Sequence, residues 1–216
     1  MIDLHTHSIL SDGALLPSEL VRRAEIKGYR VMAITDHADI SNLDFILPRI
    51  IQFCLDIKNK TKIKVIPGVE LTHIQPGDFK TMVKKARELG AAIVIGHGET
   101  IVEPVVKGTN RAAIEAGVDI LAHPGIIEES DAELALNQGV FLEISARAGH
   151  CLGNGHVAKT ALKIGTKLVI NTDSHIPENL ITREQANSVC QGAGLDPAYI
   201  VELIQNTEIF IEKIWK

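Results

Sequence analysis

Two histidines, His5 and His7, stand two positions apart near the start of the chain, and Asp12 follows them on a predicted turn. In an extended strand alternate side chains point to the same face, so the two imidazoles project together about 7 Å apart along the strand. That spacing lets them share one metal ion, with the Asp12 carboxylate aimed at the same mouth. A single His-x-His pair is weak evidence, because it also occurs without a metal. The rest of the chain, however, repeats the design.

Further histidines and carboxylates follow short apolar runs along the chain. The candidate metal ligands are His5, His7, Asp12, His37, Glu70, His97, His123, Asp173 and His175. Singly, each is more often a hydrogen-bonded core histidine or a helix-capping carboxylate. Together they would incur heavy desolvation and repulsion without a counter-ion, which divalent cations supply. Nitrogen and oxygen ligands without thiolate suit Zn, Mn or Fe, and the sequence does not choose among these metals.

The elements that must position these residues alternate between strand and helix. Apolar runs predict strands at about 1–6, 31–35, 64–69, 91–96, 119–122, 140–144 and 167–172. Helices are predicted at about 17–28, 42–60, 78–89, 108–116, 131–138, 155–164, 181–192 and 197–214. Parallel strands that are buried on both faces read as near-continuous apolar runs, so this order predicts an α/β fold with a parallel sheet covered by helices.

The distribution of polar residues separates two α/β architectures. An open doubly wound sheet binds its ligand at one switch point and would draw candidates from two or three strands. An α/β barrel builds its site from the C-terminal ends of several strands, and here six strands contribute. The sequence therefore favours a barrel of seven units, although it does not settle closure. Since no linker or low-complexity tract interrupts the chain, we expect one domain over residues 1–216.

Composition argues against several classes of protein. The formal net charge of −5 does not suit a nucleic-acid coat. No apolar run approaches the roughly 18 residues of a membrane span, and the start of the chain lacks the features of a signal peptide. Three cysteines without a Cys-x-x-Cys pair are typical of reduced thiols. We therefore expect a cytoplasmic protein with no membrane contact and no nucleic-acid partner, and we leave its oligomeric state open.

The motifs that carry these residues resemble those of the PHP (polymerase and histidinol phosphatase) family, and in particular its stand-alone histidinol-phosphatase-like phosphoesterases. In chain order they are Asp3-Leu4-His5-Thr6-His7, Ser11-Asp12-Gly13, Thr35-Asp36-His37, Gly68-Val69-Glu70, Gly96-His97, Ala122-His123-Pro124 and Thr172-Asp173-Ser174-His175. The resemblance implies a distorted seven-stranded parallel (β/α)7 TIM-like barrel. It also implies two to three divalent metal ions, bound as a trinuclear centre when all three sites are filled.

The resemblance further implies which residues share each ion, in three overlapping sets. The first ion would be held by His5, His7, Glu70 and Asp173, the second by Glu70 as a bridge with His97 and His123, and the third by Asp12, His37 and His175. All nine positions of the family pattern are filled in this chain. We therefore expect an intact rather than a degenerate centre.

The implied activity is metal-dependent hydrolysis of a phosphomonoester, with a small phosphorylated metabolite such as histidinol phosphate as substrate. Metal ions lower the pKa of bound water towards 7 and so supply a nucleophile. Arg147, just past the sixth strand, is the candidate that binds phosphoryl oxygens, because its planar fork suits them. The expected catalytic residues are Glu70, Asp173, His175 and Arg147, and the expected substrate-binding residues are Arg147, His73 and Glu99.

Weaker candidates remain on helices and loops. Arg111 and Arg183 lie on predicted helices, where arginine usually faces solvent. His150 and His156 lie on loops that follow strands, where a histidine is more often merely solvated. Cys151 has no predictable histidine partner that would activate it as a nucleophile.

Other functions stay open at this point. Within the family, the alternatives are a nucleotide phosphatase or a nuclease, although a single-strand nuclease would favour a basic stripe and an aromatic platform, and aromatic residues make up only 4% of this chain. A metallo-hydrolase could cleave an amide or a lactone instead. A non-enzymatic barrel could serve as a subunit of a ribonucleoprotein, but such a scaffold has no need of nine metal-ligating side chains.

Overall fold

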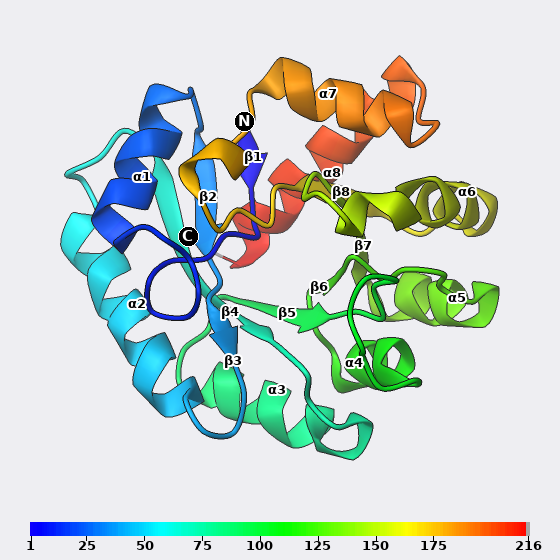
Figure 1. Ribbon diagram of the computed structural model, residues 1–216, viewed down its shortest axis with the longest axis horizontal. Helices are drawn as coiled ribbons and strands as arrows, with labels where there is room; N and C mark the ends of the chain where they lie inside the picture. The colour runs from blue at the N-terminus through cyan, green and yellow to red at the C-terminus, as the bar shows by residue number, and fades with distance from the viewer. Residues whose placement is uncertain (215–216) are drawn as a thin grey trace.

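Strands and helices alternate along the chain in the computed structural model, which describes residues 1–214 (Figure 1). The last two residues of the predicted domain, 215–216, lie outside this range. The strands are β1 Ile2–Asp3, β2 Val31–Ile34, β3 His37–Ala38, β4 Lys64–Leu71, β5 Ile93–His97, β6 Ile120–Ala122, β7 Phe141–Ser145 and β8 Leu168–Asn171. The helices are α1 Pro17–Ile26, α2 Leu43–Ile57, α3 Phe79–Glu88, α4 Thr109–Ala116, α5 Glu129–Gln138, α6 Asn154–Ile164, α7 Arg183–Gly192 and α8 Pro197–Ile214.

All pairings between these strands are parallel, in the order β1-β2-β4-β5-β6-β7-β8, with the short β3 beside β4. The seam between the first and last strands is joined by a single bridge, between Thr6 and Ser174. There the backbone N–H of His7 donates to the carbonyl of Ser174 at 2.9 Å. The predicted seven-stranded α/β barrel is therefore confirmed, and its distortion lies at this seam.

The helices surround the strands, while α8 lies behind the barrel in the view of Figure 1. The barrel interior is filled by apolar side chains that form one buried cluster, among them Leu4, Ala33, Ile66 and Ile95. Ile211 of α8 belongs to the same cluster, so this helix closes the N-terminal end of the barrel. Polar residues are therefore left to the opposite end, where the strands finish.

Inward-facing positions alternate along each strand, and this period carries polar side chains to the C-terminal mouth. In β5, Ile93 and Ile95 point into the barrel core, and His97 is next in the same series. In β4 the corresponding series runs from Ile66 to Glu70. A polar residue two positions beyond a buried interior residue thus faces the centre of the mouth.

Local signals account for many helix ends. Pro17 stands in the first turn of α1, where its missing N–H is not needed. Thr182 and Gln185 form a reciprocal capping box at the start of α7. Gly117, at a φ of 80°, ends α4 in the left-handed conformation that glycine adopts freely.

The first strand differs most from its predicted range of 1–6, since β1 covers only Ile2–Asp3. Beyond it, side chains replace the ladder: the N–H of Leu4 donates to Asn171 Oδ1 at 2.8 Å, and that of His5 to Asp3 Oδ1 at 3.3 Å. The two-residue strand β3 was not predicted from the sequence. Both deviations lie at the mouth, where the backbone bends around the polar residues.

In the part of the chain that the structure describes, no helix combines the length and the apolar character needed to cross a membrane.

The close packing of the barrel can be tested at Gly68 of β4. A Cβ at this position would lie 2.6 Å from Ile93 Cγ2 and 2.9 Å from the Ile93 carbonyl oxygen. Gly68→Ala should therefore lower the free energy of unfolding by about 1–3 kcal/mol, measured by urea denaturation. The matched control is Gly77→Ala, because a Cβ there meets no atom within 4 Å. Equal denaturation midpoints for the two variants would contradict the packing described here.

Candidate metal centre

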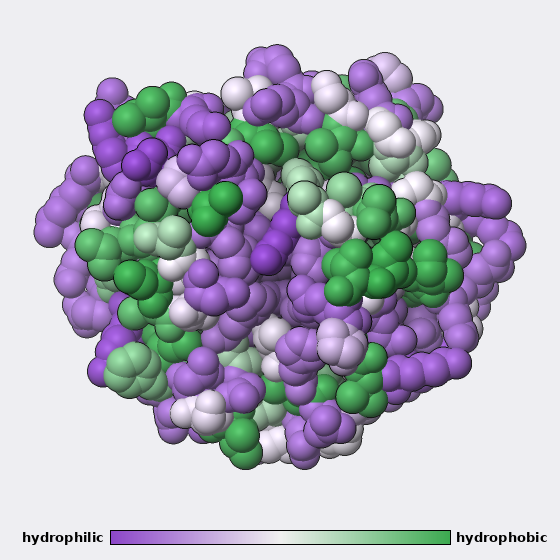
Figure 2. Space-filling model, viewed as in Figure 1, coloured by the Kyte–Doolittle hydropathy of each residue, from purple (hydrophilic) through white to green (hydrophobic). Residues whose placement is uncertain are grey.

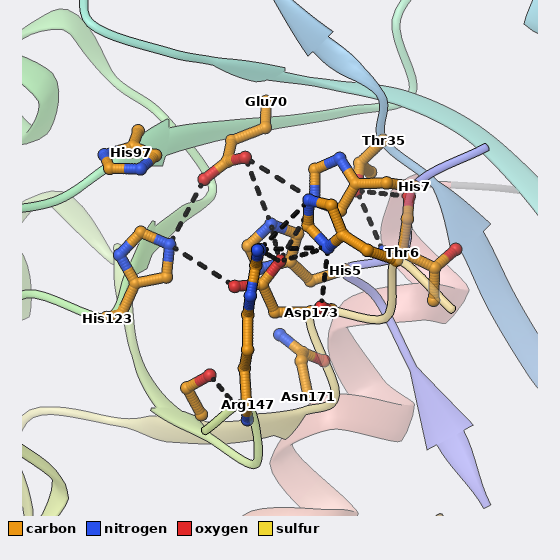
Figure 3. Close-up of polar contacts among 12 residues, drawn as sticks. His5, Thr6, His7, Thr35, Glu70, His97, His123, Arg147, Asn171 and Asp173 are labelled. Carbon is orange, nitrogen blue, oxygen red and sulfur yellow. Dashed lines mark hydrogen bonds and ion pairs between the residues drawn. The ribbon is translucent and has the colours of Figure 1, made fainter. Parts of the chain in front are cut away.

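The nine predicted ligands meet at the C-terminal mouth of the barrel, although they come from seven separate segments of the chain. Figure 3 shows His5, His7, Glu70, His123 and Asp173 pointing toward one another. In Figure 2 the surface at the centre of the same view as Figure 1 is hydrophilic, and apolar side chains surround it. The convergence expected from the sequence is thus present, and binding of metal by these residues stays a prediction.

The ligand atoms divide into overlapping groups in which all atoms lie within 4.8 Å of one another. These groups are His5, His7 and Glu70; His5, His123 and Asp173; Glu70, His97 and His123; and His7, Asp12, His37 and His175. The second predicted set therefore recurs unchanged. The third recurs with His7 added, and the first is split, because Asp173 groups with His5 and His123.

Glu70 lies between these groups because its two carboxylate oxygens face different histidines. Oε2 is 3.3 Å from His5 Nε2 and 2.7 Å from His37 Nδ1. Oε1 is 3.5 Å from His123 Nε2. The carboxylate is fully buried, so it is placed as a bridge between two of the groups.

The group with Asp12 lies nearest to solvent. Asp12 Oδ1 is 3.2 Å from His175 Nε2 and 3.6 Å from His37 Nε2. The exposed fraction of the Asp12 side chain is 56%, whereas the ligands of the other groups are buried. A cation held here would be the most accessible to a substrate.

Buried polar atoms without partners test whether this set of residues fits metal ions. Buried side-chain atoms without a hydrogen bond include His5 Nε2, both ring nitrogens of His7, Glu70 Oε1, His123 Nδ1 and Asp173 Oδ2. Leaving such groups unsatisfied costs about 1–3 kcal/mol each. Among the described residues only two other buried atoms, Tyr29 Oη and Asp131 Oδ1, lack such a bond, so most of these atoms belong to predicted ligands. Nitrogen and oxygen donors suit divalent cations. The residues present therefore fit metal binding.

The charges in the centre also match metal binding. Burial by itself would raise the pKa of Glu70 and of Asp173, but the His5 imidazole beside them holds both pKa values well below their ordinary range. Burial lowers the pKa of His7 to about 3. Burial likewise disfavours charge on His5, but Glu143 and Glu70 hold its pKa well above the ordinary value. Ionised carboxylates and neutral imidazoles are the states that bind metal, and a cation would replace the proton on His5.

Glu143 of β7 orients His5 from behind, a role that the sequence analysis did not assign. Its Oε2 is 2.8 Å from His5 Nδ1 and accepts a hydrogen bond from Asn171 Nδ2 at 2.9 Å. A carboxylate on the second ring nitrogen fixes the tautomer of a ligating histidine and leaves Nε2 for the metal. The inward series of β7, which includes Phe141, already places Glu143 inside the barrel.

Two further buried aspartates hold the loops of the centre. Asp36 accepts hydrogen bonds from the backbone N–H and hydroxyl groups of Ser8 and Ser11, and so fixes the loop that carries Asp12. Asp3 accepts from the backbone N–H of Thr172 at 3.1 Å and from its hydroxyl at 2.5 Å. These contacts explain why both aspartates accompany the ligand motifs.

The backbone is strained at the centre. His73, His123 and Asp173 have φ values of 52°, 28° and 51°. Residues other than glycine adopt such angles at a cost and only where the surroundings impose them, and these positions gather at functional sites. These positive φ angles thus lower the stability of the fold and orient the three side chains.

The three residues expected to contact substrate lie in different surroundings. Arg147 Nη1 donates to Asp173 Oδ1 at 3.2 Å and lies 2.9 Å from His175 Nδ1, with 29% of the Arg147 side chain exposed. His73 lies at the rim, where its ring stacks on His97. Glu99 instead caps α4, since its Oε1 accepts the backbone N–H groups of Gly108 and Asn110. That contact gives Glu99 a structural role, and its contact with substrate stays a prediction.

Two loop residues join the mouth beside these. His150 Nδ1 is 2.7 Å from Thr100 Oγ1, and its ring stacks on His123 with centroids 4.2 Å apart. Glu103 Oε2 is 3.0 Å from His97 Nε2. Glu103 was missed because it lies inside a long loop and not at the end of a strand, so periodicity carries no signal for it.

Three other weaker candidates have contacts outside the ligand groups. His156 Nε2 contacts the carbonyl of Ile127 at 2.8 Å, and Arg111 pairs with Asp131. Arg183 begins α7 and lines an apolar cavity beside Met1. Cys54, Cys151 and Cys190 are all free thiols.

A parallel α/β barrel with histidines and carboxylates gathered at its C-terminal mouth defines a barrel protein with a candidate polynuclear metal centre. The chain belongs to the PHP domain family, whose model matches residues 3–187. An uncharacterized protein of Methanocaldococcus jannaschii is 50% identical over 195 residues, which are 89% of each chain. A protein of Shewanella pealeana named Probable phosphatase is 26% identical over 220 residues, covering 89% of this chain and 84% of that protein.

The chain is also similar to part of a longer protein, and it shares its fold with two solved structures. DNA polymerase/3'-5' exonuclease PolX of Bacillus subtilis is 30% identical over 198 residues, 82% of this chain but 35% of that protein. A chain of archaeal ribonuclease P, solved with mature tRNA, matches with a TM-score of 0.75 at 21% identity, over 97% of this chain and 90% of that one. The histidinol phosphate phosphatase of Lactococcus lactis, solved with Zn, L-histidinol and phosphate, matches with a TM-score of 0.60 at 18% identity, over 90% and 94% of the two chains.

Removing divalent metal tests the centre without a substrate. Zn²⁺ or Mn²⁺ added to chelator-treated protein should raise the melting temperature by about 5–10 °C, because cations at about 100 times their dissociation constant stabilise by about 2.7 kcal/mol. Asp173→Asn should reduce that shift. Thermal melts that coincide with and without metal would show that these residues bind no cation.

Proposed function

We propose that this protein is a metal-dependent phosphomonoesterase that acts on a small phosphorylated metabolite through a trinuclear centre. The observation that carries the proposal is the meeting of the ligand groups at one mouth, with Arg147 beside Asp173 and His175. Relatives named Probable phosphatase support it, since they match over most of the chain. Histidinol phosphate is the substrate to test first, because a protein of the same fold is a histidinol phosphate phosphatase.

The three predicted ligand sets assign these residues to three cations. His5, His7, Glu70 and Asp173 would hold the first cation, Glu70 with His97 and His123 the second, and Asp12 with His37 and His175 the third. Divalent cations there would lower the pKa of bound water and offset charge that builds on the phosphoryl group.

Side chains of the protein would orient the metal ligands and stabilise the charge that develops on the phosphoryl group. Glu70 is buried with its two oxygens facing different histidines, so this one carboxylate would serve as a ligand to two cations. Glu143 holds His5 in the tautomer that leaves Nε2 free. Arg147 is partly exposed at the mouth, where its fixed positive charge can bind phosphoryl oxygens as negative charge develops on them.

The alternative functions would require other features of the site. An amide or lactone hydrolase would use the same cations without a need for Arg147. A nuclease or a ribonucleoprotein subunit would bind nucleic acid, and similarity to a ribonuclease P chain at 21% identity concerns the fold alone. A panel of p-nitrophenyl phosphate, histidinol phosphate, nucleotides, an ester and a lactone separates these classes after reconstitution with Mn, Fe or Zn. Hydrolysis of the ester or lactone alone would refute the phosphatase proposal.

Two ligand variants test the catalytic centre. Asp173→Asn and His97→Ala should each lower kcat/KM for p-nitrophenyl phosphate by at least about 100-fold, because each removes a metal ligand. His156→Ala is the matched control, since this histidine contacts the Ile127 carbonyl away from the centre. Circular dichroism checks that each variant folds. Near-normal rates in folded Asp173→Asn would refute the assignment.

Arg147 is tested through the two kinetic constants. Arg147→Ala should raise KM and lower kcat for a phosphomonoester, with a combined loss of about 100-fold, because one fixed donor to the developing charge is removed. Arg111→Ala should leave both constants unchanged, since Arg111 pairs with Asp131 on the outer helices. If kcat and KM are both unaltered in Arg147→Ala, this residue has no part in phosphate binding.

A further inference from the structure

Glu103 lies in the loop between β5 and α4 and reaches back over the rim of the mouth. Its Oε2 is 3.0 Å from His97 Nε2 and 3.8 Å from His73 Nε2. Its Oε1 is 3.4 Å from His150 Nε2. The carboxylate thus sits among imidazoles from three different segments of the chain, and none of the predicted ligand sets contains it.

The orientation of His97 makes this contact informative. His97 Nδ1 lies 3.1 Å from the carbonyl oxygen of Gly98, which can only accept a hydrogen bond, so Nε2 is the ring nitrogen left to face Glu103. Nε2 lies 3.0 Å from a carboxylate oxygen of Glu103. A ring nitrogen and a carboxylate oxygen at that distance are joined either by a proton or by a metal ion. Ligands that are each about 2.0–2.2 Å from one ion lie at about this separation.

His73 completes the arrangement from the loop after β4. Its backbone has a φ of 52°, and its ring stacks on His97 with centroids 5.1 Å apart. Ligand atoms of His73, His97 and Glu103 all lie within 4.8 Å of one another. The strained backbone of His73 thus holds an imidazole beside the same carboxylate oxygen that faces His97.

We propose that His73, His97 and Glu103 form a fourth divalent-cation site at the rim of the mouth. This site competes with the inner group of Glu70, His97 and His123, because His97 Nε2 has one lone pair and can bind one ion at a time. The rim site is open to solvent, with 50% of the His73 side chain and 33% of the Glu103 side chain exposed. A cation from solvent therefore meets His97 here before it reaches the buried group.

Binding of Zn²⁺ to metal-free protein tests the site, because it requires no substrate. His123→Ala disables the inner group and leaves His97 to the rim. In calorimetric titrations, His123→Ala should bind one Zn²⁺ equivalent at the rim site. The double variant His123→Ala/Glu103→Gln should lose that equivalent or bind it at least tenfold more weakly. His123→Ala/His73→Ala should show the same loss.

The control is His123→Ala/Glu115→Gln, which removes an exposed carboxylate from α4 and should bind like His123→Ala. Identical isotherms for His123→Ala and its Glu103→Gln form would overturn the rim site. If His123→Ala does not fold, Glu70→Gln provides a second background, because Glu70 also belongs to the inner group. If Glu103→Gln removes that equivalent while the unmutated protein hydrolyses no phosphomonoester, the proposed function is refuted and this site is retained, so the two proposals fail separately.

Discussion

The carboxylate of Glu70 is the constraint on which the mouth of the barrel depends. It is fully buried, and the imidazoles of His5, His7, His37 and His123 all lie within 3.6 Å of its oxygens. A buried carboxylate surrounded by imidazoles is stable only if protons or cations balance the charge. Burial lowers the pKa of His7 to about 3, so this imidazole is neutral and brings no positive charge to the carboxylate. The centre therefore suits divalent cations, whose binding here stays a prediction.

The barrel makes this concentration of polar groups possible. Its N-terminal end is closed by α8 through Ile211, and its interior is filled by apolar side chains. The alternation of side chains along each parallel strand then delivers every polar inward residue to the other end. The cost appears in the backbone, where His123 and Asp173 adopt positive φ angles. A barrel filled with apolar side chains thus supports a strained rim that carries many ionisable groups.

The sequence predicted the fold and the meeting of the ligands because both depend on local patterns. His97 follows Ile93 and Ile95 at a period of two, so its direction can be read from the strand itself. The roles of Glu99 and Glu103 could not be read in this way. Both lie on one loop, yet Glu99 turns to cap α4 and Glu103 turns to His97. Nothing in their neighbours along the chain distinguishes the two carboxylates.

What the sequence determined by itself was the order of strands and helices, the end of the barrel that carries the site, and the residue types that meet there. These follow from apolar periodicity and from residues placed directly after strands. Only the tertiary structure decided which side chains support the ligands, such as Glu143 behind His5, and which loop residues fold over the mouth. Such contacts join residues more than a hundred positions apart or on irregular loops. Their geometry depends on how the whole barrel packs, and no local pattern encodes it.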